Sequence, residues 1–158
     1  MPLSLLLDEN ISQVIAEQVR LKRSDIAVLS IHHWHEGAYL SVPDEVLLAA
    51  AYAEGLTLVT YDTQILSELS YIFEEEITFG GLIFVDAKTI ASSDFGSLTR
   101  AIVHLWETQH ALDWSNRLMY LPARRHSYRG VCQSARKTDR RRSRQTAADP
   151  GYEQQEVR

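Results

Sequence analysis

Two hydrophobic periods alternate along the first 121 residues. Short, nearly continuous apolar runs predict buried strands at 4–7, 26–31, 56–60, 82–85 and 118–121. Between them, apolar residues at helical spacing predict helices at 11–22, 43–54, 65–73 and 93–110. Continuous apolar strands alternating with helices are typical of a mainly parallel sheet that is covered on both faces. The pattern therefore predicts an α/β domain over residues 1–121.

The composition changes at Pro122. Residues 1–121 carry 17 acidic and 6 basic side chains, a formal charge of −11, whereas residues 122–158 carry 4 acidic and 10 basic ones, a charge of +6. With few large apolar residues, the second segment cannot offset the entropy lost on ordering, so we expect a mostly disordered basic tail at 122–158. Its arginine run (Arg140, Arg141, Arg142 and Arg144) has three interpretations: RNA binding through phosphates, contact with an acidic partner, or no role.

The overall composition excludes several classes of protein. The single cysteine, Cys132, can form neither an internal disulfide nor a cysteine-rich zinc site. No apolar run reaches the roughly 18 residues that cross a bilayer, so we expect no membrane partner. Together these features favour a reduced, cytoplasmic setting.

Acidic residues follow three of the predicted strands. Asp8 and Asp86 come directly after strands, Asp62 comes two residues after one, and Asp44 opens the helix at 43–54. The carboxyl ends of parallel strands meet at one edge of a sheet, which is where ligands bind. Clustered carboxylates repel one another, and all-oxygen ligands suit Mg²⁺ or Mn²⁺. These acids thus predict a metal site that could activate water for phosphoryl displacement.

Each acid also has a purely structural interpretation. Asp44 could end a Ser41-x-x-Asp44 capping box, and Asp62 could cap the helix that follows it. Asn10 could cap the helix expected at 11–22, or it could hydrogen bond to a water on a metal ion. We interpret Asp86 as structural.

Three segments resemble one family in order and spacing. LLLDENIS at 5–12, PDEVLLAAA at 43–51 and LTLVTYD at 56–62 look like the three motifs of a compact group of bacterial PIN-like domains. The likeness covers residues 1–121 and implies a PIN-like three-layer α/β/α sandwich. It also implies that Asp8, Asp44 and Asp62 are the catalytic, metal-binding acids, with possible support from Glu9 and Asn10.

The family implies a function as well. PIN domains are metal-dependent nucleases that mostly act on RNA, and many bacterial members are VapC-type toxins that are paired with an antitoxin. The resemblance therefore implies an endoribonuclease that uses Mg²⁺ or Mn²⁺ to hydrolyse RNA phosphodiester bonds. Its expected partners are the RNA substrate, an antitoxin protein and, since relatives commonly dimerise, a second copy of the chain.

Two departures from the family pattern support an alternative. Gln64 stands where the third motif often has a second aspartate, and the extra glutamate of larger members has no clear equivalent, although Glu9 or Glu36 could substitute. The alternative is a catalytically weak PIN-like scaffold that binds RNA or a protein partner. The cluster His32-His33-Trp34-His35-Glu36 could bind a metal or stack on a base through Trp34, but a polar loop around a partly buried tryptophan is favoured.

Overall fold

A computed structural model describes residues 1–67 and 78–123 of the chain, and all of these belong to one unit, Met1–Arg125. Strands and helices alternate, as the apolar pattern predicts. The helices and strands are β1 (Leu5–Leu7), α1 (Val14–Lys22), β2 (Val28–Ser30), the short 3₁₀ turn η1 (Trp34–Gly37), α2 (Asp44–Ala53), β3 (Thr57–Thr60), β4 (Leu82–Phe84), α4 (Phe95–Gln109) and β5 (Leu118–Tyr120).

The five predicted strands are confirmed to within two residues, but the start of the first helix is wrong. The helix begins at Val14 and not at residue 11. Ile11 donates its backbone N–H to the carbonyl of Asp8 over 3.0 Å, so a turn separates β1 from α1. Ile11 is nevertheless buried, which explains why its apolar side chain reads as part of the helix. Of the helix predicted at 65–73, residues 65–67 are helical and 68–73 lie outside the described residues.

The strands form one sheet in the order β2-β1-β3-β4-β5, and every neighbouring pair is parallel. Leu7, the last residue of β1, lies opposite Ser30 on one side and Val59 on the other. The chain thus leaves β1 toward β2 and later returns to the other side of β1 with β3. This reversal of strand order makes the carboxyl ends of β1 and β3 the place where a ligand is expected.

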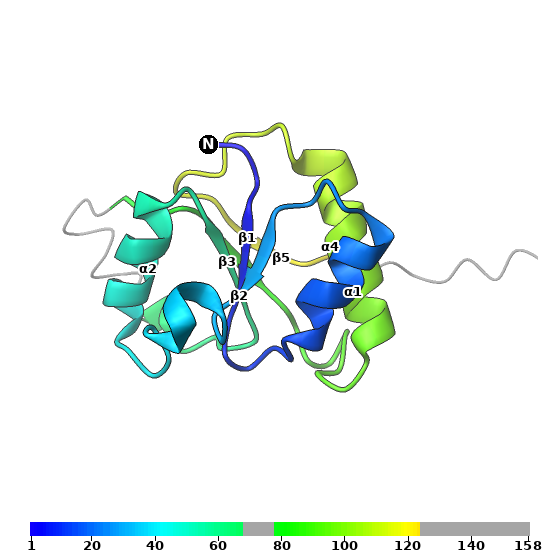
Figure 1. Ribbon diagram of the computed structural model, residues 1–158, viewed down its shortest axis with the longest axis horizontal. Coiled ribbons are helices and arrows are strands. Elements are labelled where there is room, and N and C mark those ends of the chain that lie inside the picture. The colour runs from blue at the N-terminus through cyan, green and yellow to red at the C-terminus, as the bar shows by residue number, and fades with distance from the viewer. Residues whose placement is uncertain (68–77, 124–158) are drawn as a thin grey trace, which may run out of the picture. The chain divides into compact units, whose positions relative to one another are not determined.

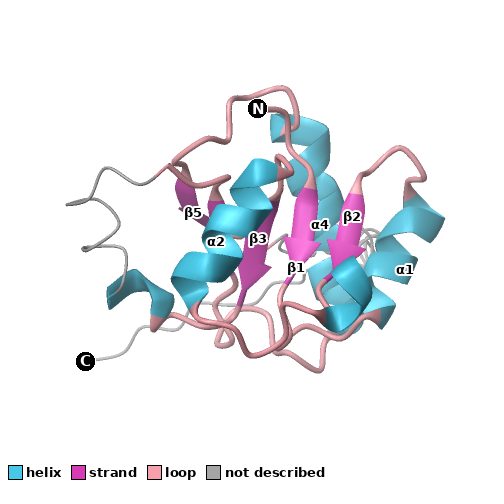
Figure 2. Ribbon diagram, turned by 60° about the vertical axis from the view of Figure 1, so that its left-hand side comes forward, coloured by secondary structure: helices cyan, strands magenta, loops and turns pink. Residues whose placement is uncertain are grey.

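Helices cover both faces of the sheet, so the domain has three layers. Figure 1 shows α2 on one side of the strands and α1 with α4 on the other, and Figure 2 shows α2 in front of β3. Successive strand residues point to opposite faces. Leu5 and Leu7 therefore pack with α1 and α4, whereas Leu6 packs in the cluster with α2. The expected α/β sandwich with both faces covered is confirmed, and its sheet is wholly parallel over the described residues.

A close approach of backbone fixes the position of β4. A Cβ atom on Gly80 would lie 2.0 Å from the carbonyl oxygen of Leu56, and one on Gly81 would lie 2.6 Å from that of Trp114. Gly81 also has a φ of +95°, which L side chains rarely adopt. The Gly80-Gly81 pair therefore allows the turn before β4 to pass directly against its neighbours.

Residues 122 and 123 are the only part of the expected tail that the structure describes, so the arginines at 140–144 lie outside it. Within the described ranges, no helix has the length and apolar character needed to cross a membrane.

Candidate functional site

A pocket opens at the carboxyl ends of β1 and β3, where the strand order reverses. Its cavity volume is about 50 Å³, and it is open to solvent. The three motif acids, Asp8, Asp44 and Asp62, all line it, although they are far apart in the sequence. The remaining lining residues are Glu9, Asn10, Ile31, Tyr39, Ser41, Val42, Leu47, Leu58, Thr60 and Ile65.

Asp8 is the most enclosed of the three acids, since only 8% of it is exposed. Its carboxylate accepts two hydrogen bonds, from the backbone N–H of Glu9 over 2.7 Å and from the hydroxyl of Thr60 over 2.6 Å. Its own N–H donates to the carbonyl of Val59. These bonds connect the ends of the two central strands. They hold a negative charge in place at the floor of the pocket, where it would be costly without such donors.

Asp62 is linked to Asp8 through the same threonine. The hydroxyl oxygen of Thr60 accepts from the backbone N–H of Asp62 over 2.9 Å while its proton goes to Asp8. The Asp62 carboxylate accepts from the N–H of Gln64 over 2.7 Å, at the start of the helical residues 65–67. The structural role that the sequence offered for Asp62 is therefore present, and its side chain still lines the pocket. Gln64 is exposed and is not among the residues that line the pocket.

Asp44 is the first residue of α2 and is partly buried at the pocket wall. The capping box predicted between Ser41 and Asp44 is wrong. Pro43 occupies the N-cap position, and no side chain accepts the capping hydrogen bond there. Ser41 instead has a φ of +57° and donates its backbone N–H to the carboxylate of Glu9 over 3.1 Å.

Glu9 and Asn10 lie at the rim of the pocket, and both are exposed. Glu9 joins two segments there, because its carboxylate accepts from Ser41 and its carbonyl lies 3.2 Å from the Nε2 atom of His32. The N-cap role considered for Asn10 is wrong, because α1 begins four residues later with Gln13 at its N-cap position. Because Asn10 lies at the rim, the other interpretation, a hydrogen bond to a bound water, is compatible with its position.

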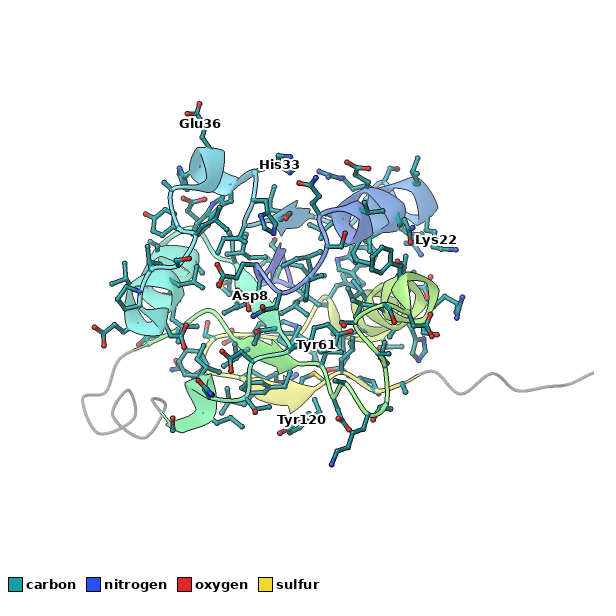
Figure 3. All side chains as sticks on the ribbon, turned by 90° about the horizontal axis from the view of Figure 1, so that it is seen from below. Asp8, Lys22, His33, Glu36, Tyr61 and Tyr120 are labelled. Carbon is teal, nitrogen blue, oxygen red and sulfur yellow. The ribbon has the colours of Figure 1, made fainter. Side chains whose placement is uncertain are left out.

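Sequence reasoning missed one wall of the pocket, which comes from the loop after β2. Tyr39, Ser41 and Val42 line the pocket, but this loop has no hydrophobic period that could have placed them. Trp34 is buried, with 5% of its surface exposed, so it cannot stack on a base. The favoured interpretation, a polar loop around a buried tryptophan, is confirmed. Glu36 lies at the outer tip of this loop, away from Asp8 (Figure 3), and so cannot replace the missing glutamate.

Asp86 is placed apart from these residues. It is not among the pocket residues, and its carboxylate accepts from the backbone N–H of Lys88 and the hydroxyl of Thr89. These hydrogen bonds hold the pKa of Asp86 below its usual value, the backbone bond having the larger effect. The structural interpretation of Asp86 is thereby confirmed.

The donor set of the pocket fits a hard cation that keeps part of its water shell. In residues 1–67 and 78–123, no three His, Cys, Asp or Glu side chains form a group that could hold a metal ion by themselves. Mg²⁺, however, is usually bound by one or two carboxylates together with several waters and substrate phosphates. Asp8 and its neighbours offer such carboxylates at the side of an open pocket, with room for waters between them.

Comparisons with known proteins do not identify this chain. No family model matches it, and neither the curated proteins nor the solved structures contain a significant match. The likeness to PIN-like domains therefore rests on the three motif segments alone.

Proposed function

We propose that this chain is a PIN-like, metal-dependent endoribonuclease. The observation that carries the proposal is the convergence of Asp8, Asp44 and Asp62 on one pocket at the point where strand order reverses. Three segments that resemble the family's motifs contribute one acid each. The hydrogen bond from the N–H of Gln64 gives Asp62 a structural role at the start of a helical turn. That role does not explain why all three acids line one open pocket.

The three acids differ in what they can do. Asp8 is fixed by Thr60 and by the N–H of Glu9, so it is the rigid ligand for a cation. Asp44 and Asp62 are more exposed, and they would add their carboxylates to the ligands of the cation. Mg²⁺ or Mn²⁺ held by these residues would supply an activated water and would stabilise charge during displacement at an RNA phosphodiester. Glu9 and Asn10, at the rim, are placed to position waters or substrate.

The proposed biological role is the toxin half of a toxin–antitoxin pair acting in the cytoplasm. The family resemblance supports this role, together with an antitoxin protein as partner and a homodimer as the assembled form. The arginines at 140–144 are proposed to add non-specific affinity for RNA phosphates.

An RNA cleavage assay tests the enzymatic proposal. Purified wild type would be incubated with several RNAs in Mg²⁺, in Mn²⁺ and in EDTA, beside Asp8→Asn and Asp62→Asn. Each variant keeps the shape of the side chain but removes its charge, so we expect cleavage to fall by about 100-fold or more. Asp86→Asn is the matched control, because Asp86 follows a strand but lies outside the pocket, and it should cleave as wild type does.

The alternative remains a PIN-like scaffold that binds RNA or protein without cleaving. Gln64 in the third motif and the lack of a three-ligand group among the described residues favour it. Folded wild type that cleaves none of the RNAs in either metal ion would replace the nuclease proposal with this one. Cleavage that persists equally in both pocket variants would instead indicate a contaminating nuclease.

A further inference from the structure

One wall of the pocket is an aromatic ring that metal binding does not require. Tyr39 lies in the loop after β2 and lines the same pocket as Asp8, Asp44 and Asp62. It is half-buried. If the acids of this pocket act on an RNA phosphodiester, as proposed above, an aromatic ring beside them is well placed to contact the base of the same nucleotide.

The ring of Tyr39 is held in a fixed plane. It stacks on Trp34 with a centroid distance of 4.5 Å and an angle of 26°. Trp34 is itself fixed, because it is buried and its Nε1–H donates to the carboxylate of Glu54 over 2.9 Å. The other oxygen of that carboxylate hydrogen bonds to His35, so Glu54, directly after α2, holds the loop at two points.

The backbone of this loop is also unusual. His35 and Glu36 have φ values of +47° and +58°, a region that non-glycine residues rarely adopt, and Gly37 follows at +79°. Such conformations persist only where the surrounding packing determines them, and they concentrate at functional sites. Here the contacts among the rings of Trp34, His35 and Tyr39 hold the loop backbone in this conformation.

We propose that Tyr39 forms a nucleobase subsite, in which one base of a single-stranded RNA stacks on the ring while the adjoining phosphate reaches the acids. The choice of RNA rests on the proposed nuclease function. Every base has a flat π face, so stacking suits a nuclease that accepts several sequences. Because Trp34 already fixes the ring, little conformational entropy is lost when a base stacks on it.

A cationic side chain is the competing ligand for an aromatic ring near carboxylates. Sites that select cations commonly surround them with several aromatic walls. Tyr39 is the only aromatic side chain among the described residues that line this pocket, since Trp34 is covered behind it. A single flat wall fits a planar base better than a cation.

The test measures binding of short single-stranded RNAs by the full chain carrying Asp62→Asn, which prevents cleavage. One set of RNAs is intact, and a second set has an abasic site at each position in turn. Tyr39→Leu removes the π face at similar volume, Tyr39→Phe keeps it, and Tyr52→Leu is the control, because Tyr52 is exposed on α2 outside the pocket.

The expected result is a specific coupling between the ring and one base. Tyr39→Leu should weaken binding of intact RNA roughly 5- to 100-fold, and Tyr39→Phe by less than about 2-fold. For the RNA whose abasic site removes the stacked base, the Tyr39→Leu variant and the protein that retains Tyr39 should bind equally. A 2-aminopurine at that position should be quenched by the Tyr39 protein and not by the Leu variant.

Equal losses on intact and on every abasic RNA would overturn the subsite and leave Tyr39 as a packing residue of the loop. Unchanged binding by Tyr39→Leu would overturn it too, and binding of an arginine-rich peptide that depends on Tyr39 would then assign the ring to a cationic protein segment. Failure of the nuclease proposal is recognised separately, as no cleavage by wild type while the coupling to a base remains.

Discussion

Thr60 links Asp8 to Asp62 in the proposed site, and Thr60→Val tests this link most directly. Its hydroxyl donates to the carboxylate of Asp8 and accepts from the backbone N–H of Asp62, and the residue is 1% exposed. Valine has nearly the same shape and suits a strand. The substitution therefore removes two hydrogen bonds while it leaves the packing of β3 almost unchanged.

The expected loss of stability follows from the three groups involved. A hydrogen bond to a charged group contributes about 1.5–3 kcal/mol, and the partly buried N–H of Asp62, left without an acceptor, costs about 1–2 kcal/mol. Burying a methyl group in place of the hydroxyl returns roughly 1 kcal/mol. We expect a net decrease of about 2–4 kcal/mol in the free energy of unfolding. Total stabilities are roughly 5–15 kcal/mol, so the change is large enough to measure.

Urea unfolding of both proteins at neutral pH measures this difference, provided that the slope with denaturant is the same. Thr60→Ser is the control, since it keeps the hydroxyl and loses one methyl group, for a cost of about 1 kcal/mol. A valine variant at least as stable as the serine variant would refute the reasoning. It would mean that the hydroxyl does not bridge Asp8 and Asp62 in solution.

Two further predictions concern the loop and the turn before β4. The pKa of Glu54 is lowered from 4.5, chiefly by the hydrogen bond from Trp34, so its contribution to stability is present above pH 4.5 and is lost as the pH falls below it. Glu54→Gln should therefore flatten the acid side of the profile of melting temperature against pH, and an unchanged profile would contradict this. Gly80→Ala should cost about 3 kcal/mol or more in urea unfolding, because its Cβ would meet the Leu56 carbonyl. Gly55→Ala has a φ of +69°, and its Cβ would make only ordinary van der Waals contact with Met1, so it should cost only about 1–2 kcal/mol.

The sequence predicted the sheet and the meeting of its acids for the same physical reason. Short continuous apolar runs such as Leu5–Leu7 are typical of strands buried on both faces, and parallel strands bring their carboxyl ends to one edge. Asp8 and Asp62 could thus be placed together without any knowledge of contacts. The metal and nuclease assignments stay predictions, because a carboxylate that lines a pocket and one that holds an ion look alike in sequence.

The parts that sequence reasoning missed lack a repeating pattern. The loop carrying Tyr39 takes left-handed conformations at His35 and Glu36, and nothing in the sequence pattern marks these two positions for them. The cap considered for Asn10 is absent for a related reason, because the buried Ile11 follows the spacing of α1 but lies in the turn before it. Tertiary packing decides both cases.

The residues that line the pocket have a consequence for the order of synthesis. All of them lie between Asp8 and Ile65. The ribosome has therefore synthesised every residue that lines the pocket before it makes β4, α4 and β5. Yet Val59 and Leu7, directly beneath the site, pack in the same core as Ile83 and Leu98 of the later half. The nascent chain therefore carries all the acids for an interval in which the layer that holds them together does not yet exist. Substitutions in the later half are expected to change when and how firmly the pocket closes, while its chemistry is set by the earlier half.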